Sequence, residues 1–218
     1  MISILIVDDH AMIRRGLATI LTHELPVHVV RCDEASNGLE ALQKNSNTIY
    51  DLVILDISMP GMDGLELLTR LKQNRPDLPV LVVSMHSVEQ YALRALKCGA
   101  AGFLSKQQAA DELIAATTQV LSGKRYISRL LSEQIIDQAI SGDLVKAAPS
   151  HKTLSNREFQ ILKLLSVGQI PKCIADDLGI SVKTISTFKK RIFKKMNFRN
   201  DSDMISYSIS KKLIDTPP

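Results

Sequence analysis

Three aspartates and one lysine in the first half of the chain have the types and spacing of a phosphate-handling site. Asp8, Asp9, Asp56 and Lys106 each follow closely on a short apolar run. Carboxylates that converge on one point repel each other, and a hard divalent cation is the usual reason to tolerate this. Mg²⁺ suits the set, because it takes one or two carboxylates, a carbonyl and waters and leaves room for phosphate. A carboxylate can also attack phosphorus to form an acyl phosphate, while the metal and the lysine neutralise the transferring oxygens.

The apolar runs predict the elements that bring these residues together. Runs such as 4–7 and 52–55 are short and wholly apolar, which is typical of strands buried on both faces. Strand and helix alternate up to residue 121, and such alternation predicts a parallel sheet with helices on both faces. The four residues follow strands, so they should meet at one end of that sheet. The expected strands are 4–7, 27–32, 52–55, 78–83 and 102–104, and the expected helices are 11–24, a short one from 39, 65–73, 88–97 and 109–121.

The 218-residue chain divides into an acidic and a basic part. Residues 1–122 carry 10 Lys and Arg against 14 Asp and Glu, a net charge of −4, whereas the remainder carries 17 against 9, a net charge of +8. This asymmetry suggests that one part handles cations and the other polyanions. We expect two domains, at 1–122 and 151–216, joined by a linker at 123–150.

The linker contains one further expected helix, 129–140, with apolar residues at helical spacing. This helix either packs on a neighbouring domain or serves as a coiled dimer contact or a signalling lever.

Cysteine usage and the N-terminus indicate a cytoplasmic protein. Cys32, Cys98 and Cys173 are odd in number, far apart and without CxxC spacing, so neither a disulfide framework nor a zinc site is expected. The first apolar run stops at Asp8, which is too short for a signal peptide or a membrane span. We therefore expect no membrane association.

The second half is helical in pattern, with expected helices at 158–166, 171–178, 182–196 and 202–213. A tight Gly179-Ile180 turn between two of them predicts a helix-turn-helix. Helix 182–196 carries six basic residues and no acidic one, whereas an ordinary solvated helix mixes its charges. Its apolar residues should form a buried stripe: Ile185, Phe188, Ile192 and Met196. Its opposite face should be turned toward a DNA groove: Lys183, Ser186, Thr187, Lys190 and Lys194. A membrane or an acidic partner is the alternative for such a helix.

Four motifs of the first half occur in a fixed order: Ile-Leu-Ile-Val-Asp8-Asp9-His, Leu-Asp56-Ile-Ser-Met-Pro60-Gly-Met-Asp-Gly64, Val-Ser84-Met and Gly-Ala-Ala-Gly-Phe103-Leu-Ser-Lys106. Together they resemble the receiver domain of bacterial two-component response regulators. The resemblance implies a flavodoxin-like (βα)5 doubly wound parallel sheet. It also implies that the aspartate at position 56 accepts phosphate from a sensor histidine kinase.

The same resemblance implies roles for single residues. The implied Mg²⁺ ligands are Asp9 directly, Asp8 mainly through water, Asp56, and the backbone carbonyl of Ser58. Lys106 would pair with the phosphoryl group, the Ser84 hydroxyl would move to bond a phosphoryl oxygen, and Phe103 would turn inward as it does so. His10 is expected to pack over the first turn of a helix rather than to take part.

Some positions depart from the common receiver pattern. Gln107 stands where many receivers have proline, so no cis peptide bond is expected there, since non-proline cis bonds cost about 3 kcal/mol. Phe103 lacks the hydroxyl of a tyrosine, so its switch involves only packing and burial. Ser58 and His86 lie where receivers tune hydrolysis of their acyl phosphate, and we hypothesise that these two side chains set the lifetime of the activated state.

Three motifs of the second half are Leu154-Ser-Asn-Arg157-Glu158, Ile174-Ala175-Asp-Asp-Leu178-Gly-Ile180-Ser181-Val-Lys-Thr184-Ile185 and Lys195-Met196-Asn. They resemble the LuxR-type helix-turn-helix, an all-α four-helix domain, and with the receiver they are similar to the NarL/FixJ class of response regulators. The resemblance implies major-groove DNA contacts from Lys183, Thr184, Ser186, Thr187, Lys190, Arg191 and Lys194. It also implies a homodimer through the last helix, by way of Met204, Ile205, Ser208 and Ile209.

The sequence thus predicts a regulator of transcription that is phosphorylated on Asp56 and at most assists its own phosphorylation and dephosphorylation. One alternative is a phosphohydrolase, although that class generally wants a second acid where Ser58 stands. The other is a phosphorylation-independent DNA-binding regulator whose receiver is only an interaction module.

Overall fold

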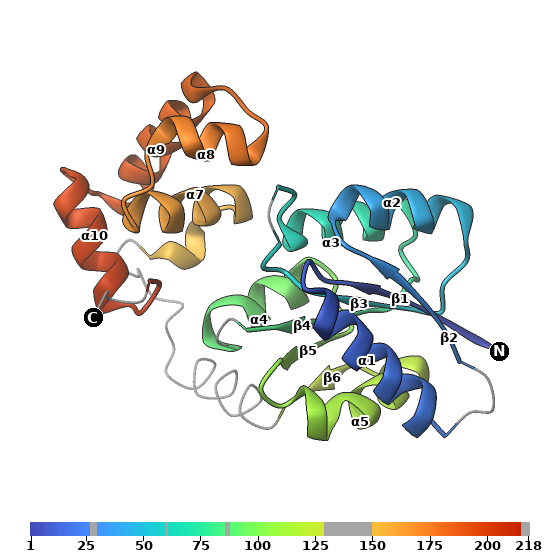
Figure 1. Ribbon diagram of the computed structural model, residues 1–218. Helices are drawn as coiled ribbons and strands as arrows, with labels where there is room; N and C mark the ends of the chain where they lie inside the picture. The colour runs from blue at the N-terminus through green and yellow to red at the C-terminus, as the bar shows by residue number, and fades with distance from the viewer. Residues whose placement is uncertain (27–29, 60, 86–87, 129–149, 215–218) are drawn as a thin grey trace. The chain divides into compact units, whose positions relative to one another are not determined.

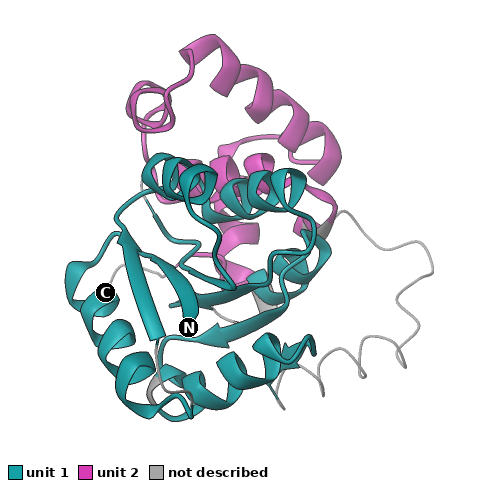
Figure 2. Ribbon diagram, turned by 90° about the vertical axis from the view of Figure 1, so that its right-hand side faces the viewer, with its two compact units in different colours: residues 1–140 teal, residues 141–218 magenta. Residues whose placement is uncertain are grey.

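The computed structural model describes residues 1–26, 30–59, 61–85, 88–128 and 150–214 (Figure 1). The chain forms two compact units, residues 1–140 and 141–218 (Figure 2). The first contains β1 (Ile2–Val7), α1 (Ala11–Glu24), β2 (Val30–Ala35), α2 (Gly38–Asn47), β3 (Leu52–Leu55), α3 (Gly64–Asn74), β4 (Val80–Ser84), α4 (Val88–Lys97), β5 (Gly102–Ser105), α5 (Ala109–Leu121) and β6 (Tyr126–Ile127). The second contains the 3-10 helix η1 (His151–Thr153), α7 (Asn156–Ser166), α8 (Pro171–Leu178), α9 (Val182–Met196) and α10 (Asp201–Ser210).

The strands of the first unit form one sheet in the order β2-β1-β3-β4-β5-β6, and every pair is parallel. Helices α1 and α5 cover one face and α2, α3 and α4 cover the other (Figure 1). The predicted flavodoxin-like doubly wound sheet is therefore confirmed. In such sheets ligands bind beyond the carboxyl ends of the strands, where the strand order reverses. Here that point lies between β1 and β3.

The core between the sheet and helices α1 and α5 explains why the strand runs are so apolar. Ile4, Ile6 and Ile54 are buried there against Leu21 and Leu113. Because β1, β3 and β4 are covered on both faces, every side chain along β3 and β4 is buried. This packing fixes the strand ends and hence the polar residues that follow them.

One glycine lets helix α3 start close to the end of β3. A Cβ at Gly64 would lie 2.4 Å from the Ile57 Cα and 2.5 Å from the Asp56 carbonyl oxygen, distances that real Cβ atoms essentially never show. Just before it, the Asp63 carboxylate accepts a hydrogen bond from Leu65 N at 2.8 Å and caps the helix.

The second unit has the predicted helix-turn-helix. The Ser155 side chain and Glu158 form a capping box at the start of α7, and Pro171 occupies the first turn of α8. Gly179 ends α8 in the left-handed region at φ 63°, where glycine costs least. The Ser181 hydroxyl then accepts a hydrogen bond from Thr184 N and caps α9.

Several predicted boundaries need correction. β2 extends to Ala35, three residues beyond its predicted end at 32, because it is an edge strand in which Arg31 is exposed and Asp33 half-buried. The predicted start, at 27–29, lies outside the described residues. β6 was not predicted, since two residues leave no periodic signal. The last helix stops at Ser210, before a turn in which Lys212 adopts φ 50°. The predicted helix 129–140 lies outside the described residues. Within the described chain there is no cis peptide bond, as expected at Gln107.

Candidate functional site

The carboxyl ends of β1, β3 and β5 bring the predicted charged residues together. Lys106 Nζ lies 2.5 Å from Asp8 Oδ2 and 2.7 Å from Asp56 Oδ2, so one ammonium bridges two carboxylates. Asp8 and Asp56 are almost fully buried, with exposed fractions of 1% and 2%. Ligand atoms of Asp8, Asp9, His10 and Asp56 all lie within 4.8 Å of one another. This spacing is suited to a single divalent cation.

Burial and the neighbouring charges shift the pKa values of Asp56 and Lys106 in opposite directions. Burial raises the pKa of Asp56, and the hydrogen bond and charge of Lys106 only partly offset that. Burial on its own would lower the pKa of Lys106, but its hydrogen bonds to the two carboxylates outweigh this and leave the pKa above its ordinary value. Lys106 is therefore a permanent cation at neutral pH. A cation in this position offsets the negative charge of both Asp8 and Asp56.

Of the residues predicted to act on the phosphorylated state, Ser58 contacts Asp56, and Ser84 lies next to Ser58. Ser58 N donates to Asp56 Oδ1 at 3.0 Å, and the Ser58 and Ser84 hydroxyls are 3.4 Å apart. Ser84 is fully buried, and Phe103 is only 1% exposed. Phe103 therefore already faces inward. The inward turn that the resemblance implies would start from an exposed Phe103, and this structure does not contain that conformation. His86 lies outside the described residues.

For two residues near the acidic cluster the structure departs from the sequence analysis: the expectation for His10 is wrong, and Arg14 was missed. His10 precedes α1, and its ring is 66% exposed rather than packed over the helix, with Nδ1 2.9 Å from Asp9 Oδ1 and 3.3 Å from Asp8 Oδ1. Arg14 donates from Nη1 to the Asp8 carbonyl at 2.7 Å and from Nε to Glu34 at 2.9 Å. A basic residue one helical turn beyond the acidic motif was the available signal for Arg14.

A second candidate surface lies on α9 of the other unit. Ile185, Ile192 and Met196 are buried and Phe188 is partly buried, as the predicted stripe requires. The residues predicted to face DNA are exposed, apart from the half-buried Thr184: Lys183, Ser186, Thr187, Lys190, Arg191 and Lys194. The hydroxyl of Thr184 instead lies 2.8 Å from that of Ser181, within the helix cap.

Two further lysines of α9 are paired inside the unit. Lys189 Nζ lies 2.7 Å from an Asp201 carboxylate oxygen, and Lys195 Nζ lies 2.7 Å from the buried Glu158 Oε2. Among the described residues, Lys183, Lys190 and Lys194 have no such ion pair, and the Arg191 guanidinium lies 6.0 Å from the Phe188 ring centroid. The cations available to a polyanion are therefore fewer than the composition of the helix suggests.

The predicted dimerisation residues divide into two groups. Met204 and Ser208 are buried in their own unit, and the Ser208 hydroxyl lies 2.8 Å from that of Ser166. Ile205 and Ile209 are 36% and 42% exposed. Two of the four are thus core residues, and only the two isoleucines present apolar surface.

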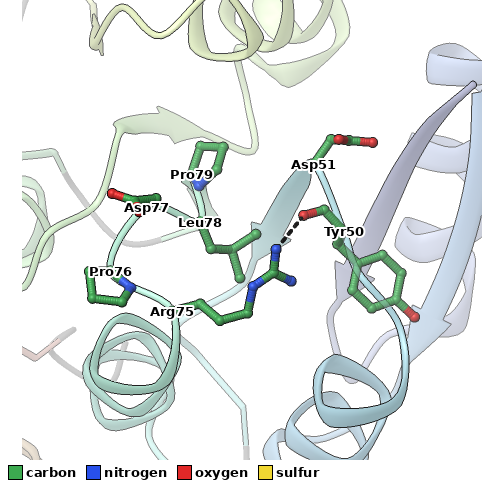
Figure 3. A pocket seen from close by; sticks show the side chains of 7 residues that line it. All are labelled: Tyr50, Asp51, Arg75, Pro76, Asp77, Leu78 and Pro79. Carbon is green, nitrogen blue, oxygen red and sulfur yellow. Dashed lines mark hydrogen bonds between the residues drawn. The ribbon is translucent and has the colours of Figure 1, made fainter.

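A cavity of about 370 Å³ lies at the opposite end of the sheet from the acidic cluster. Its lining residues, drawn in Figure 3, are Tyr50, Asp51, Arg75, Pro76, Asp77, Leu78 and Pro79. The Arg75 guanidinium points to the Tyr50 carbonyl oxygen, at 3.4 Å. None of the predicted site residues lines it, and it lies at the amino ends of β3 and β4, where parallel sheets do not usually bind ligands.

Comparison with known proteins identifies the class to which both sites belong. Residues 4–118 match the response regulator receiver domain, and residues 152–208 match the luxR family of bacterial regulatory proteins. The chain therefore belongs to the response regulators that join a receiver domain to a LuxR-type DNA-binding domain. This is a family of transcription regulators rather than of phosphohydrolases.

Individual relatives match along nearly the whole chain. The oxygen regulatory protein NreC of Staphylococcus epidermidis is 34% identical over 97% of this chain and 99% of its own length. The response regulator UvrY of Escherichia coli is 32% identical over 96% of this chain and 94% of its own. Among solved structures, RcsB from Salmonella enterica serovar Typhimurium, bound to promoter rprA in the presence of phosphomimetic BeF3⁻, has a TM-score of 0.67 at 27% identity, covering 96% of this chain and all of that one.

No helix in the described part of the chain is both long enough and apolar enough to cross a membrane.

Proposed function

We propose that Asp56 accepts a phosphoryl group from a sensor histidine kinase, and that this modification controls transcription through DNA binding by the second unit. The observation that carries the proposal is the contact of Lys106 Nζ with both Asp56 and Asp8 at the carboxyl edge of the sheet. A buried nucleophile with a cation held beside it is what transfer of a charged phosphoryl group requires.

In the transfer, an Asp56 carboxylate oxygen attacks phosphorus as the bond from phosphorus to the kinase histidine breaks. Lys106, which contacts the Asp56 carboxylate, would also contact a transferring oxygen and offset its charge. Mg²⁺, when bound, neutralises the remaining charge and orients the phosphoryl group. The residues proposed to hold it are Asp8, Asp9, Asp56 and the backbone carbonyl of Ser58. Asp9 Oδ1 suits this role, because it is buried and accepts no hydrogen bond within the described chain.

The second step is recognition of double-stranded DNA by a homodimer. Ser186, Thr187 and Lys190 are exposed along one side of α9 and would meet base edges in the major groove. The neighbouring exposed cations would contact phosphates and supply most of the affinity. Solved RcsB relatives are described as bound to promoter DNA and as dimers on DNA, which supports this assignment. The proposed dimer contact uses Ile205 and Ile209.

We assign these events to the cytoplasm, and the only chemistry assigned to the chain is help with its own phosphorylation and dephosphorylation. Lys106 and the Ser58 and Ser84 hydroxyls are the groups placed to assist that chemistry. The metal and the phosphodonor are both supplied from outside the chain.

The test is incubation of the full chain with acetyl phosphate and Mg²⁺, followed by intact mass and DNA-binding measurements. We expect one added phosphoryl group on the native chain and on Asp77→Asn, an exposed aspartate at the far end of the sheet. Asp56→Asn should gain none. An adduct on Asp56→Asn would refute the assignment. An adduct that leaves DNA affinity unchanged would favour the phosphorylation-independent regulator.

A further inference from the structure

His10 lies at the mouth of the acidic cluster in a fixed position. Its backbone N–H donates to Asp8 Oδ1 at 2.8 Å, which ties the residue to the end of β1. The ring is 66% exposed and makes no polar contact in the described chain other than with the two neighbouring carboxylates. An imidazole is therefore held over the atoms assigned to the metal.

The contact between His10 and Asp9 has the distance of a hydrogen bond but not its geometry. His10 Nδ1 lies 2.9 Å from Asp9 Oδ1, yet Oδ1 is a buried carboxylate oxygen that accepts no hydrogen bond from the described residues. The contact is therefore a close approach of two possible ligand atoms, both within 4.8 Å of ligand atoms of Asp8 and Asp56. Two ligand atoms at right angles on an octahedral ion with bonds of about 2.1 Å lie about 3.0 Å apart. The observed separation matches that spacing.

We propose that His10 is a nitrogen ligand of this pocket and shifts its metal preference from Mg²⁺ toward divalent transition-metal ions. This inference rests on the proposed metal site and adds its selectivity. Mg²⁺ prefers oxygen, whereas imidazole nitrogen favours the later first-row ions, whose affinities rise from Mn²⁺ through Co²⁺ and Ni²⁺. The three carboxylates of the cluster serve either kind of ion. The imidazole adds affinity only for the transition-metal ions.

The test compares Mg²⁺ with Co²⁺ by calorimetric titration of the full chain at about pH 8, where an ordinary imidazole is neutral. We expect the Co²⁺-to-Mg²⁺ affinity ratio to fall about tenfold or more in His10→Gln. It should not change in His23→Gln, which removes an exposed histidine near the end of α1, the helix that His10 precedes. In the Co²⁺-loaded native chain, paramagnetic NMR should show shifted imidazole ring resonances that His10→Gln abolishes.

A ratio that does not change in His10→Gln, or native Co²⁺ spectra without a shifted imidazole, would overturn the inference. Phosphorylation of the native chain with acetyl phosphate and Mg²⁺ is measured in parallel. If the native chain takes phosphate but the ratio does not change, only the role of His10 is wrong. If the native chain takes no phosphate, the proposed function fails, and the two metal measurements still decide the role of His10.

Discussion

Lys194 and Lys195 are neighbours on α9 whose removal should affect two different properties of the chain. Lys195 Nζ lies 2.7 Å from the buried Glu158 Oε2 of α7, so it ties α9 to α7 of the same unit. Lys194 is exposed and has no ion-pair partner among the described residues. We therefore expect Lys195→Ala to lower stability and Lys194→Ala to weaken DNA binding.

The magnitude for Lys195→Ala follows from its surroundings. A hydrogen bond to a charged group is worth about 1.5–3 kcal/mol. The Lys195 side chain is 44% exposed, and solvent screening reduces the expected loss to about 1–2 kcal/mol. For a domain of this size, each kcal/mol lowers Tm by about 4–8 °C. Lys194→Ala, as a surface change, should stay within about 0.5 kcal/mol.

The DNA-binding magnitude for Lys194→Ala follows from counterion release. Each phosphate contact contributes about 0.9 to the slope of log affinity against log salt concentration, so a dimer should lose about 1.8 in slope. Lys195→Ala should keep the native slope of log affinity against log salt concentration at temperatures where the variant is folded. The reason is that the Lys195 ammonium is already paired with Glu158.

The assays are calorimetric unfolding of the full chain and a salt titration with a random-sequence duplex. Glu158→Gln serves as a control that removes the same ion pair from the other side and should reproduce the stability loss of Lys195→Ala. If Lys195→Ala lowered the salt slope as much as Lys194→Ala, or if both lowered Tm equally, the division of roles would be refuted.

Three further predictions concern stability. Burial would raise the pKa of Glu158, but the hydrogen bonds from Lys195 and the helix cap outweigh it and leave the pKa below its usual value. The Lys195–Glu158 pair therefore stabilises the folded chain at pH values above the unfolded pKa of Glu158, about 4.3. This stabilisation is lost as the pH falls through the lower folded pKa, so the Tm advantage of the native chain over Lys195→Ala should shrink in acid. Gly64→Ala forces a Cβ into backbone and should cost about 2 kcal/mol or more by unfolding measurement, whereas Gly16→Ala, with open space around it, should be neutral or stabilising. Thr117→Val removes a buried hydroxyl without a partner in the described chain and should raise stability by about 1 kcal/mol, which a lower Tm would contradict.

Much of the receiver could be predicted because its signals are local. Short runs buried on both faces mark β1, β3 and β4, and the carboxyl-end rule then places Asp8, Asp56 and Lys106 at one edge. The bridging of both aspartates by Lys106 could not be predicted, since it depends on side-chain geometry between strands far apart in sequence. The end of β2 was predicted three residues too early for the opposite reason, because an edge strand carries polar side chains that resemble a loop.

His10 shows why a single residue next to a motif is hard to interpret. A histidine before a helix usually packs over its first turn, and the periodicity of α1 gives no reason to expect otherwise. Its position over Asp8 and Asp9 follows from the hydrogen bond between its backbone N–H and Asp8 Oδ1, a contact set by the turn after β1. Sequence patterns record side-chain periodicity, not the turn that aims a side chain.

The basic helix shows a further limit. Helical spacing predicts which side of α9 is buried, and it counts six cations along the helix. It cannot tell that Lys189 and Lys195 are neutralised by Asp201 and Glu158, which are 12 and 37 residues away. With those two paired, four cations of α9 have no ion-pair partner among the described residues, and they are the ones that a polyanion can use. The salt dependence of DNA binding should therefore follow the unpaired cations of the folded unit rather than the charge written in the sequence of the helix.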